Sequence, residues 1–236
     1  MRVEPHGVGS IIHITQRGVR GSEIVKDERD RLRFTQALFY MNDTYSDANW
    51  MRQPTPAEPF ARPAHWPERE PLVEILGWTL LTNHFHLLVR EIREGGSAKF
   101  MQRLNGSLST YFNKKYKEKG SLFQGGYRGK TVGTDSYFSY LVFYVLIKNV
   151  LDLYPGGLVA AQKDFDNAWQ WAKRYDGSSF RDSVGGTFLP IVDDPDGLVK
   201  SVIGVGDAFK QEAQELLSFH MEARGGDFKE LMLESW

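Results

Sequence analysis

Runs of apolar, often β-branched residues bounded by glycine or polar turns predict the strands of this chain. In chain order the predicted strands cover residues 10–16, 72–80, 84–92 and, after a glycine-rich turn, about 127–132. A short segment, residues 81–83, separates the second strand from the third. These two strands are therefore expected to form a hairpin.

Apolar residues at helical spacing predict three further elements, at about residues 28–42, 97–120 and 136–153. Asp27 is a suitable N-cap for the first helix, and Thr134 or Asp135 for the last. The resulting order, β-α-β-β-α-β with an added helix, predicts an α+β protein with a ferredoxin-like antiparallel sheet.

Two segments fall outside this pattern. Residues 45–70 contain five prolines and few apolar residues, which indicates a long and mobile insertion loop. Beyond residue 158 the pattern weakens, and we expect short helices at 165–175 and within 198–220, with a loop at 185–197. The chain is therefore predicted to comprise a main domain, 1–158, and a partly helical C-terminal extension, 159–236.

Charge is distributed unevenly although the net charge is only −1. Between Lys99 and Lys130, eight Lys or Arg residues accompany one acidic residue, whereas residues 160–236 hold fourteen Asp or Glu and eight Lys or Arg. A basic central region is typical of a polyanion-binding protein. One hypothesis is that the acidic extension covers this basic region and restrains its activity.

Composition also excludes several classes of function. The chain has no cysteine, which rules out disulfides, thiolate metal ligands and a cysteine nucleophile. No apolar run approaches the ~20 residues that cross a membrane, and the N-terminus lacks a signal-peptide core. We therefore expect a soluble, cytoplasmic protein with no membrane partner.

His84 and His86 lie one residue apart in the third predicted strand. Side chains at positions i and i+2 of a strand share a face, so both imidazoles can bind one divalent metal ion. A pair of this kind also arises by chance. His13, in the first strand, is expected to be structural or to lie near the pair.

The last predicted helix carries Tyr137, Tyr140 and Tyr144, which on periodicity alone are core aromatic residues. Near a histidine-bound metal, however, a phenolate can attack a phosphodiester and form a phosphotyrosine link. Lys148 lies one turn beyond Tyr144, where it would favour the ionised phenol or contact phosphate. Asn149 could offer an oxygen to the metal, but five residues span about 140° of an α-helix, so this requires local underwinding, as at a π-bulge.

Lys114, Lys115 and Lys117 alternate with aromatic residues near the end of the second helix. This mixture suits the phosphates and stacked bases of single-stranded nucleic acid. A solvated basic helix face is the alternative.

In this order, the motifs resemble those of the REP-associated tyrosine transposases, within the HUH superfamily of single-strand endonucleases. The resemblance covers about residues 8–158 and depends on the order of its motifs rather than on any one of them. The matching segments are residues 13–18, 82–89, 122–125 with Tyr127, and 144–150.

This resemblance implies an enzyme dependent on Mg²⁺ or Mn²⁺ that nicks and rejoins single-stranded DNA beside a hairpin through a 5′-phosphotyrosine. It implies His84 and His86 as metal ligands and Tyr144 as the nucleophile. In the family a Gln or Asn lies four residues after the tyrosine and completes the metal site, whereas here that position is Lys148 and the amide follows at Asn149. Either the helix accommodates an extra residue and Asn149 is the third ligand, or the third ligand comes from elsewhere, or activity is lost. Lys148 is expected to be a catalytic residue beside Tyr144. The expected DNA contacts are Arg17, Lys114, Lys115, Lys117, Gln124, Tyr127, Arg128 and Lys130.

The resemblance further suggests a monomer or homodimer associated with the nucleoid. Two other functions stay open: a non-catalytic module that binds single-stranded nucleic acid on its sheet, and a metal phosphodiesterase that uses activated water. Tyr140 or Tyr137 could also replace Tyr144 as the nucleophile.

Overall fold

The computed structural model describes residues 3–55, 57–184, 189–204 and 208–222. The first part of the chain follows the predicted order of elements. These are β1 (Ile11–Arg17), α1 (Glu28–Met41), β2 (Val73–Leu80), β3 (His84–Glu91), α2 (Gly96–Tyr116), β4 (Arg128–Thr131) and α3 (Asp135–Phe143). A π-helical segment, η3 (Tyr144–Lys148), then joins α3 to α4 (Asn149–Leu151).

The strands form one sheet in the order β2-β3-β1-β4, and every neighbouring pair is antiparallel. This is the ferredoxin-like arrangement, so the predicted fold class is confirmed. The predicted hairpin between β2 and β3 is also present, and the Leu81 amide closes it with a 2.9 Å hydrogen bond to the His84 carbonyl.

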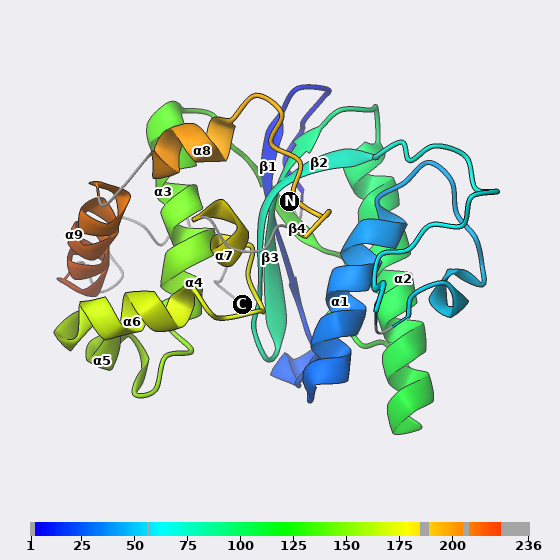
Figure 1. Ribbon diagram of the computed structural model, residues 1–236, viewed down its shortest axis with the longest axis horizontal. Helices are drawn as coiled ribbons and strands as arrows, with labels where there is room; N and C mark the ends of the chain where they lie inside the picture. Colours follow the sequence, from blue (N-terminus) through cyan, green and yellow to red (C-terminus); the bar gives the residue numbers. More distant parts are fainter. Residues whose placement is uncertain (1–2, 56, 185–188, 205–207, 223–236) are drawn as a thin grey trace.

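Helices cover both faces of the sheet (Figure 1). Helices α1 and α2 pack on one face, and α3, η3 and α4 lie on the other. Side chains alternate along each strand, so Ile14 and Phe85 enter the core beneath α1 and α2. The residues beside them, His13 and His86, point instead toward the face covered by α3 and η3.

The insertion loop contains one 3₁₀ turn, η2 (Trp50–Arg52), and is otherwise irregular in its described residues. Its aromatic side chains are nevertheless buried. Trp50 is 5% exposed and packs at a tilt against Tyr40 with ring centroids 4.8 Å apart, while the Tyr40 hydroxyl donates to the Ala61 carbonyl at 2.5 Å. The described part of the loop is thus anchored on α1, and the expectation that the loop is mobile stays a prediction.

The described part of the extension is largely helical. It contains α5 (Gly157–Lys163), α6 (Phe165–Ala172), α7 (Phe180–Ser183), α8 (Leu198–Ile203) and α9 (Ala208–Glu222). The helices expected within 165–175 and 198–220 are therefore present, whereas α5 and α7 were not predicted. The expected loop at 185–197 contains neither helix nor strand from residue 189 onward, and its first four residues lie outside the described ones.

The helices of the described extension lie beside α3, on the opposite side of the sheet from α2 (Figure 1), whereas Ile191 packs into the core beneath α1 and α2. Part of the extension pairs with the edge strand β2: the Leu80 amide donates to the Gly177 carbonyl at 2.8 Å, and the Ser179 amide donates to the Trp78 carbonyl at 3.0 Å. The helices of the described extension therefore lie away from α2, and the hypothesis that the acidic segment covers the basic region and restrains its activity stays a prediction. Among them, no helix is both long and apolar enough to cross a bilayer.

Candidate metal and nucleophile site

Three imidazoles lie together on the α3 side of the sheet. The ring centroids of His84 and His86 are 5.1 Å apart on β3, and His13 of β1 stacks on His86 at 5.2 Å. A hydrogen bond of 2.9 Å joins His13 Nε2 to His86 Nδ1, and both side chains are buried. The expectation that His13 lies near the pair is confirmed, and its contact fixes the orientation of His86.

The two histidines on β3 each use the same ring nitrogen, Nδ1, in a hydrogen bond. His86 uses Nδ1 in its bond to His13, and His84 uses Nδ1 in a 2.6 Å bond to the Asn83 side-chain oxygen. A histidine whose Nδ1 is engaged in this way coordinates a metal through Nε2. Asn83, in the hairpin turn, is thus a contributor that the sequence pattern did not single out.

The helix opposite the histidines departs from α-helical geometry at Tyr144. The backbone N–H of Asn149 donates to the Tyr144 carbonyl, an i→i+5 hydrogen bond, and the Thr79 hydroxyl of β2 donates to the Val145 carbonyl. Gly77 allows β2 to approach this segment, because a Cβ there would lie 3.2 Å from Leu146 Cδ2. The underwinding that Tyr144 and Asn149 require to share a face is therefore present.

Tyr144 contacts the histidine cluster directly. Its ring lies edge-on to His86, with centroids 5.6 Å apart, and 6.1 Å from the ring of His13. The Tyr140 ring is 6.0 Å away, and Lys148 Nζ lies 5.1 Å from the Tyr144 ring centroid. Tyr144 is only 1% exposed. The structure therefore places the expected nucleophile beside an expected metal ligand, in a buried position.

Lys148 and Asn149 interact with each other. Lys148 Nζ donates to Asn149 Oδ1 at 3.4 Å and lies 3.8 Å from a carboxylate oxygen of Asp152. Asn149 is fully buried, and its Nδ2 atom has no hydrogen-bond partner among the described residues. Lys148 thus competes for the amide oxygen that would serve as the third ligand.

The donor set fits a weakly held divalent ion. Within the described residues, no group of three or more His, Cys, Asp or Glu side chains could hold a metal. Two imidazoles and one amide oxygen would leave several coordination positions to water and to substrate phosphate, as is usual for Mg²⁺. His84, His86 and Asn149 are therefore compatible with such an ion, provided that the substrate completes the site.

Three of the residues expected to contact DNA have side chains on the same face of the sheet as the histidines. Strand register pairs Arg17 with His84, Arg128 with Thr15, and Lys130 with His13, and directly paired residues of antiparallel strands share a face. A fourth expected contact, the exposed Gln124, lies next to Arg17, because the backbone N–H of Gln124 donates to the Arg17 carbonyl.

The remaining expected DNA contacts lie on the other side of the sheet. Tyr127 packs against the core beneath α2, where burial raises the pKa of its hydroxyl. Lys114 and Lys117 are exposed on the last turn and C-cap of α2. Lys115 binds carboxylates instead, with Nζ 2.6 Å from Asp27 and 2.5 Å from Asp30. The predicted contacts therefore divide between two surfaces.

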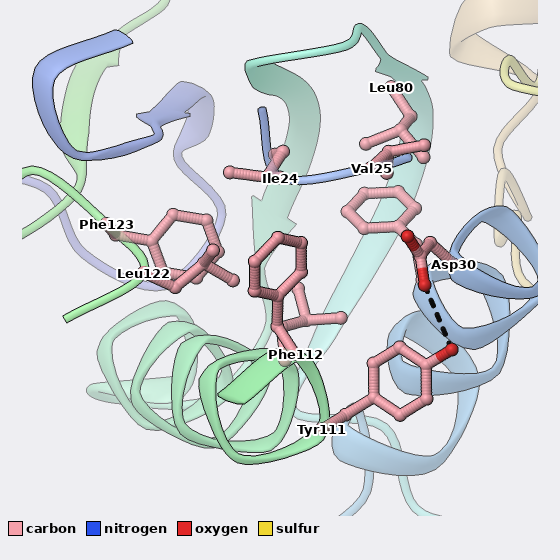
Figure 2. Close-up of a pocket in the computed structure, with 10 residues that line it drawn as sticks. Ile24, Val25, Asp30, Leu80, Tyr111, Phe112, Leu122 and Phe123 are labelled. Carbon is pink, nitrogen blue, oxygen red and sulfur yellow. Dashed lines mark hydrogen bonds between the residues drawn. The ribbon is translucent and has the colours of Figure 1, made fainter. Parts of the chain in front are cut away.

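A small cavity near Lys115 is not a ligand site. It has a volume of about 10 Å³ and lies between α1, α2 and the segment around Phe123, with the Tyr111 hydroxyl donating to Asp30 at 3.0 Å (Figure 2). A volume of this size holds at most about one water molecule.

Comparison with known proteins supports the resemblance seen in the sequence. The profile of the family described as IS200-like transposases matches residues 68–146, about a third of the chain. The match includes β2, β3 and Tyr144, and it ends before Lys148 and Asn149.

One similar solved structure is described as a REP-associated tyrosine transposase bound to a REP hairpin. It shares 13% sequence identity with this chain at a TM-score of 0.45, and the match covers 81% of this chain and 93% of that one. No curated relative matches the sequence.

Proposed function

We propose that this chain is a metal-dependent DNA endonuclease of the tyrosine transposase type, which nicks and rejoins single-stranded DNA beside a hairpin. The observation that carries this proposal is the contact between the Tyr144 and His86 rings, with His84 next to them. The family profile over residues 68–146 supports the same class of activity.

His84, His86 and Asn149 are the residues that would hold Mg²⁺ or Mn²⁺. When bound, such an ion supplies positive charge that stabilises the phosphate as negative charge develops on it. The hydrogen bond between His13 and His86 fixes the ring of His86, and Asn83 fixes that of His84. These two contacts prepare the site before any substrate arrives.

The reaction assigned to Tyr144 is a transfer of the phosphoryl group. After its hydroxyl loses a proton to water, the phenolate oxygen bonds to phosphorus and the bond to the 3′ oxygen breaks. The 3′ oxygen takes up a proton, and the 5′ phosphate stays on Tyr144. Attack by another 3′ hydroxyl reverses these steps and rejoins the strand. Lys148, 5.1 Å from the ring centroid, favours the phenolate, while Arg17 and Arg128 contact flanking phosphates.

A second candidate function is a module that binds single-stranded nucleic acid without chemistry. The burial of Tyr144 favours it, because a phosphate reaches the hydroxyl only if neighbouring side chains move. The two candidates differ in one observable, the covalent adduct.

The first experiment incubates the full chain with a single-stranded oligonucleotide that carries a hairpin, with Mn²⁺, followed by denaturing electrophoresis. We expect a protein–DNA adduct that withstands denaturant, is lost in Tyr144→Phe and His84→Ala, and needs the metal. Tyr140→Phe is the matched control, because that ring lies in the same helix 6.0 Å from Tyr144.

Each alternative gives a different gel. Nicking without an adduct indicates activated water, and DNA binding without nicking indicates the non-catalytic module. An adduct that persists in Tyr144→Phe identifies another tyrosine as the nucleophile.

A further inference from the structure

A second basic surface lies on the far side of the sheet from Tyr144. A groove of about 600 Å³ is lined by the insertion loop together with α1 and α2. Its lining includes four cationic side chains and no carboxylate. The cations are Arg33 of α1, Arg52 of the loop, and Lys114 and Lys115 of α2.

Most of this charge is not neutralised. Lys115 is paired with Asp27 and Asp30, but Arg33, Arg52 and Lys114 form no ion pair with the described residues. Arg52 and Lys114 are exposed to solvent. Three positive charges therefore face one groove without a countercharge, which attracts polyanions.

Arg33 provides evidence for an anion in the groove that does not depend on the number of charged residues. Its guanidinium lies 4.9 Å from the Trp50 ring centroid and 5.1 Å from that of Tyr111, and its buried Nε and Nη1 atoms have no hydrogen-bond partner among the described residues. Buried, unsatisfied donors are rare and costly. An anion held in the groove would offset the cost of burying this charge.

We propose that this groove binds the phosphate backbone of a DNA segment outside the nicking site. The proposal rests on the proposed function for the identity of the polyanion. The Tyr111 ring in the lining supplies a surface on which a base can stack, which suits single-stranded nucleic acid better than an acidic peptide. Because α1 and α2 lie on the sheet face opposite η3, this contact is separate from the phosphate contacts around Tyr144.

The test compares two double variants with the same change in charge. Arg52→Glu with Lys114→Glu alters the groove, and Lys99→Glu with Lys163→Glu is the control, since these lysines are also exposed and form no ion pair with the described residues. All proteins carry Tyr144→Phe, so binding is measured without chemistry. Thermal unfolding verifies that each variant is folded.

Fluorescence anisotropy measures binding of a hairpin with a long single-stranded flank and of the hairpin alone, at several salt concentrations. For the flanked DNA we expect the groove variant to bind about tenfold or more weakly than the control, with the salt slope reduced by about 1.4 for two lost single-strand contacts. For the hairpin alone, the two variants should bind equally.

Three results would overturn the proposal. Equal weakening in both double variants would mean that only overall charge matters. Equal weakening for both DNAs would place the groove within the contacts to the hairpin. Competition by polyglutamate as strong as that by single-stranded DNA of equal charge would remove the assignment to nucleic acid. Failure of the proposed function is seen separately, as the absence of an adduct with the unmodified chain.

Discussion

His86 owes its orientation to another histidine. The spacing of His84 and His86 identified the pair from sequence, because strand geometry alone places i and i+2 on one face. The bond between His13 and His86 joins residues 73 positions apart, and no local pattern encodes it. Residues that position a ligand can be recognised only when the strand register is known.

We predict that His13→Phe raises the Mn²⁺ concentration needed for half-maximal adduct formation by about 10-fold to 100-fold, the range typical when a metal-binding histidine loses the partner of its other ring nitrogen. The reason is that His86 loses the partner of its Nδ1. His65→Phe is the control, because this histidine is exposed in the insertion loop. An unchanged metal requirement in His13→Phe would mean that His13 has no role in orienting His86.

Lys115 illustrates the limit of assigning function to a basic residue from sequence. Burial alone would raise the pKa of Asp30, but hydrogen bonds from Lys115, Tyr116, the Lys26 amide and Tyr111 outweigh it and lower the pKa. Lys115→Met should therefore destabilise the protein by about 2–3 kcal/mol, since it leaves a buried carboxylate without its cation. The same substitution at the exposed neighbouring residue, Lys114→Met, should change the free energy of unfolding by less than about 0.5 kcal/mol.

The pH dependence of this effect has a definite sign. Asp30 has a lowered pKa in the folded state, so the stabilisation is present above the ordinary carboxyl pKa of 3.8 and is lost as pH falls through the folded value. Urea unfolding should thus show the Lys115→Met deficit at pH 7 and a smaller one in acid. A deficit that is constant with pH would exclude the ion pair as its cause.

Among the elements, those with a clear hydrophobic period were predictable. The strands and helices up to α3 match the sequence pattern, because each buries one periodic face. The π-helical turn could be stated from sequence only as a condition for Tyr144 and Asn149 to share a face. Its stabilisation by Thr79 depends on the packing of β2 against η3, which the local pattern does not contain.

We predict that Thr79→Val destabilises the protein by about 1–3 kcal/mol and reduces adduct formation, because the Val145 carbonyl loses its hydroxyl donor in a buried position. Thr79→Ser keeps the hydroxyl and should retain both stability and activity. Urea unfolding and the adduct gel measure the two effects. Equal behaviour of the two variants would show that the hydroxyl does not support the π-helical turn.

The irregular segments were less predictable than the regular ones. The prolines of residues 45–70 correctly indicated a loop, but Trp50 and Trp66 are buried in the core under α1 and hold the described loop in place. Aromatic residues without a period give no signal of where they pack. The sequence therefore did not predict the basic groove either, because the groove forms where this loop packs beside α2.

For the whole molecule, the order of the elements in the sequence predicted the topology, but it did not predict on which face of the sheet each charged residue lies. The extension shares one apolar core with α3 and α4: Leu141 and Leu151 cluster with Ala161, Trp169 and Phe209. The proposed domain boundary at residue 158 stays a prediction, and this core crosses it. The acidic composition of the extension does not predict this apolar contact.

Removal of residues 159–236 is therefore expected to destabilise the remaining chain rather than to activate it. The deletion would expose the apolar side chains of Leu141 and Leu151. It would also remove the hydrogen bonds that Gly177 and Ser179 make to the edge of β2, and an open strand edge promotes aggregation. Thermal unfolding and sedimentation of the 1–158 fragment should show a lower Tm and self-association. A fragment that stays monomeric, keeps its Tm and binds single-stranded DNA more tightly would instead support an inhibitory extension, because a structural role predicts a lower Tm and self-association.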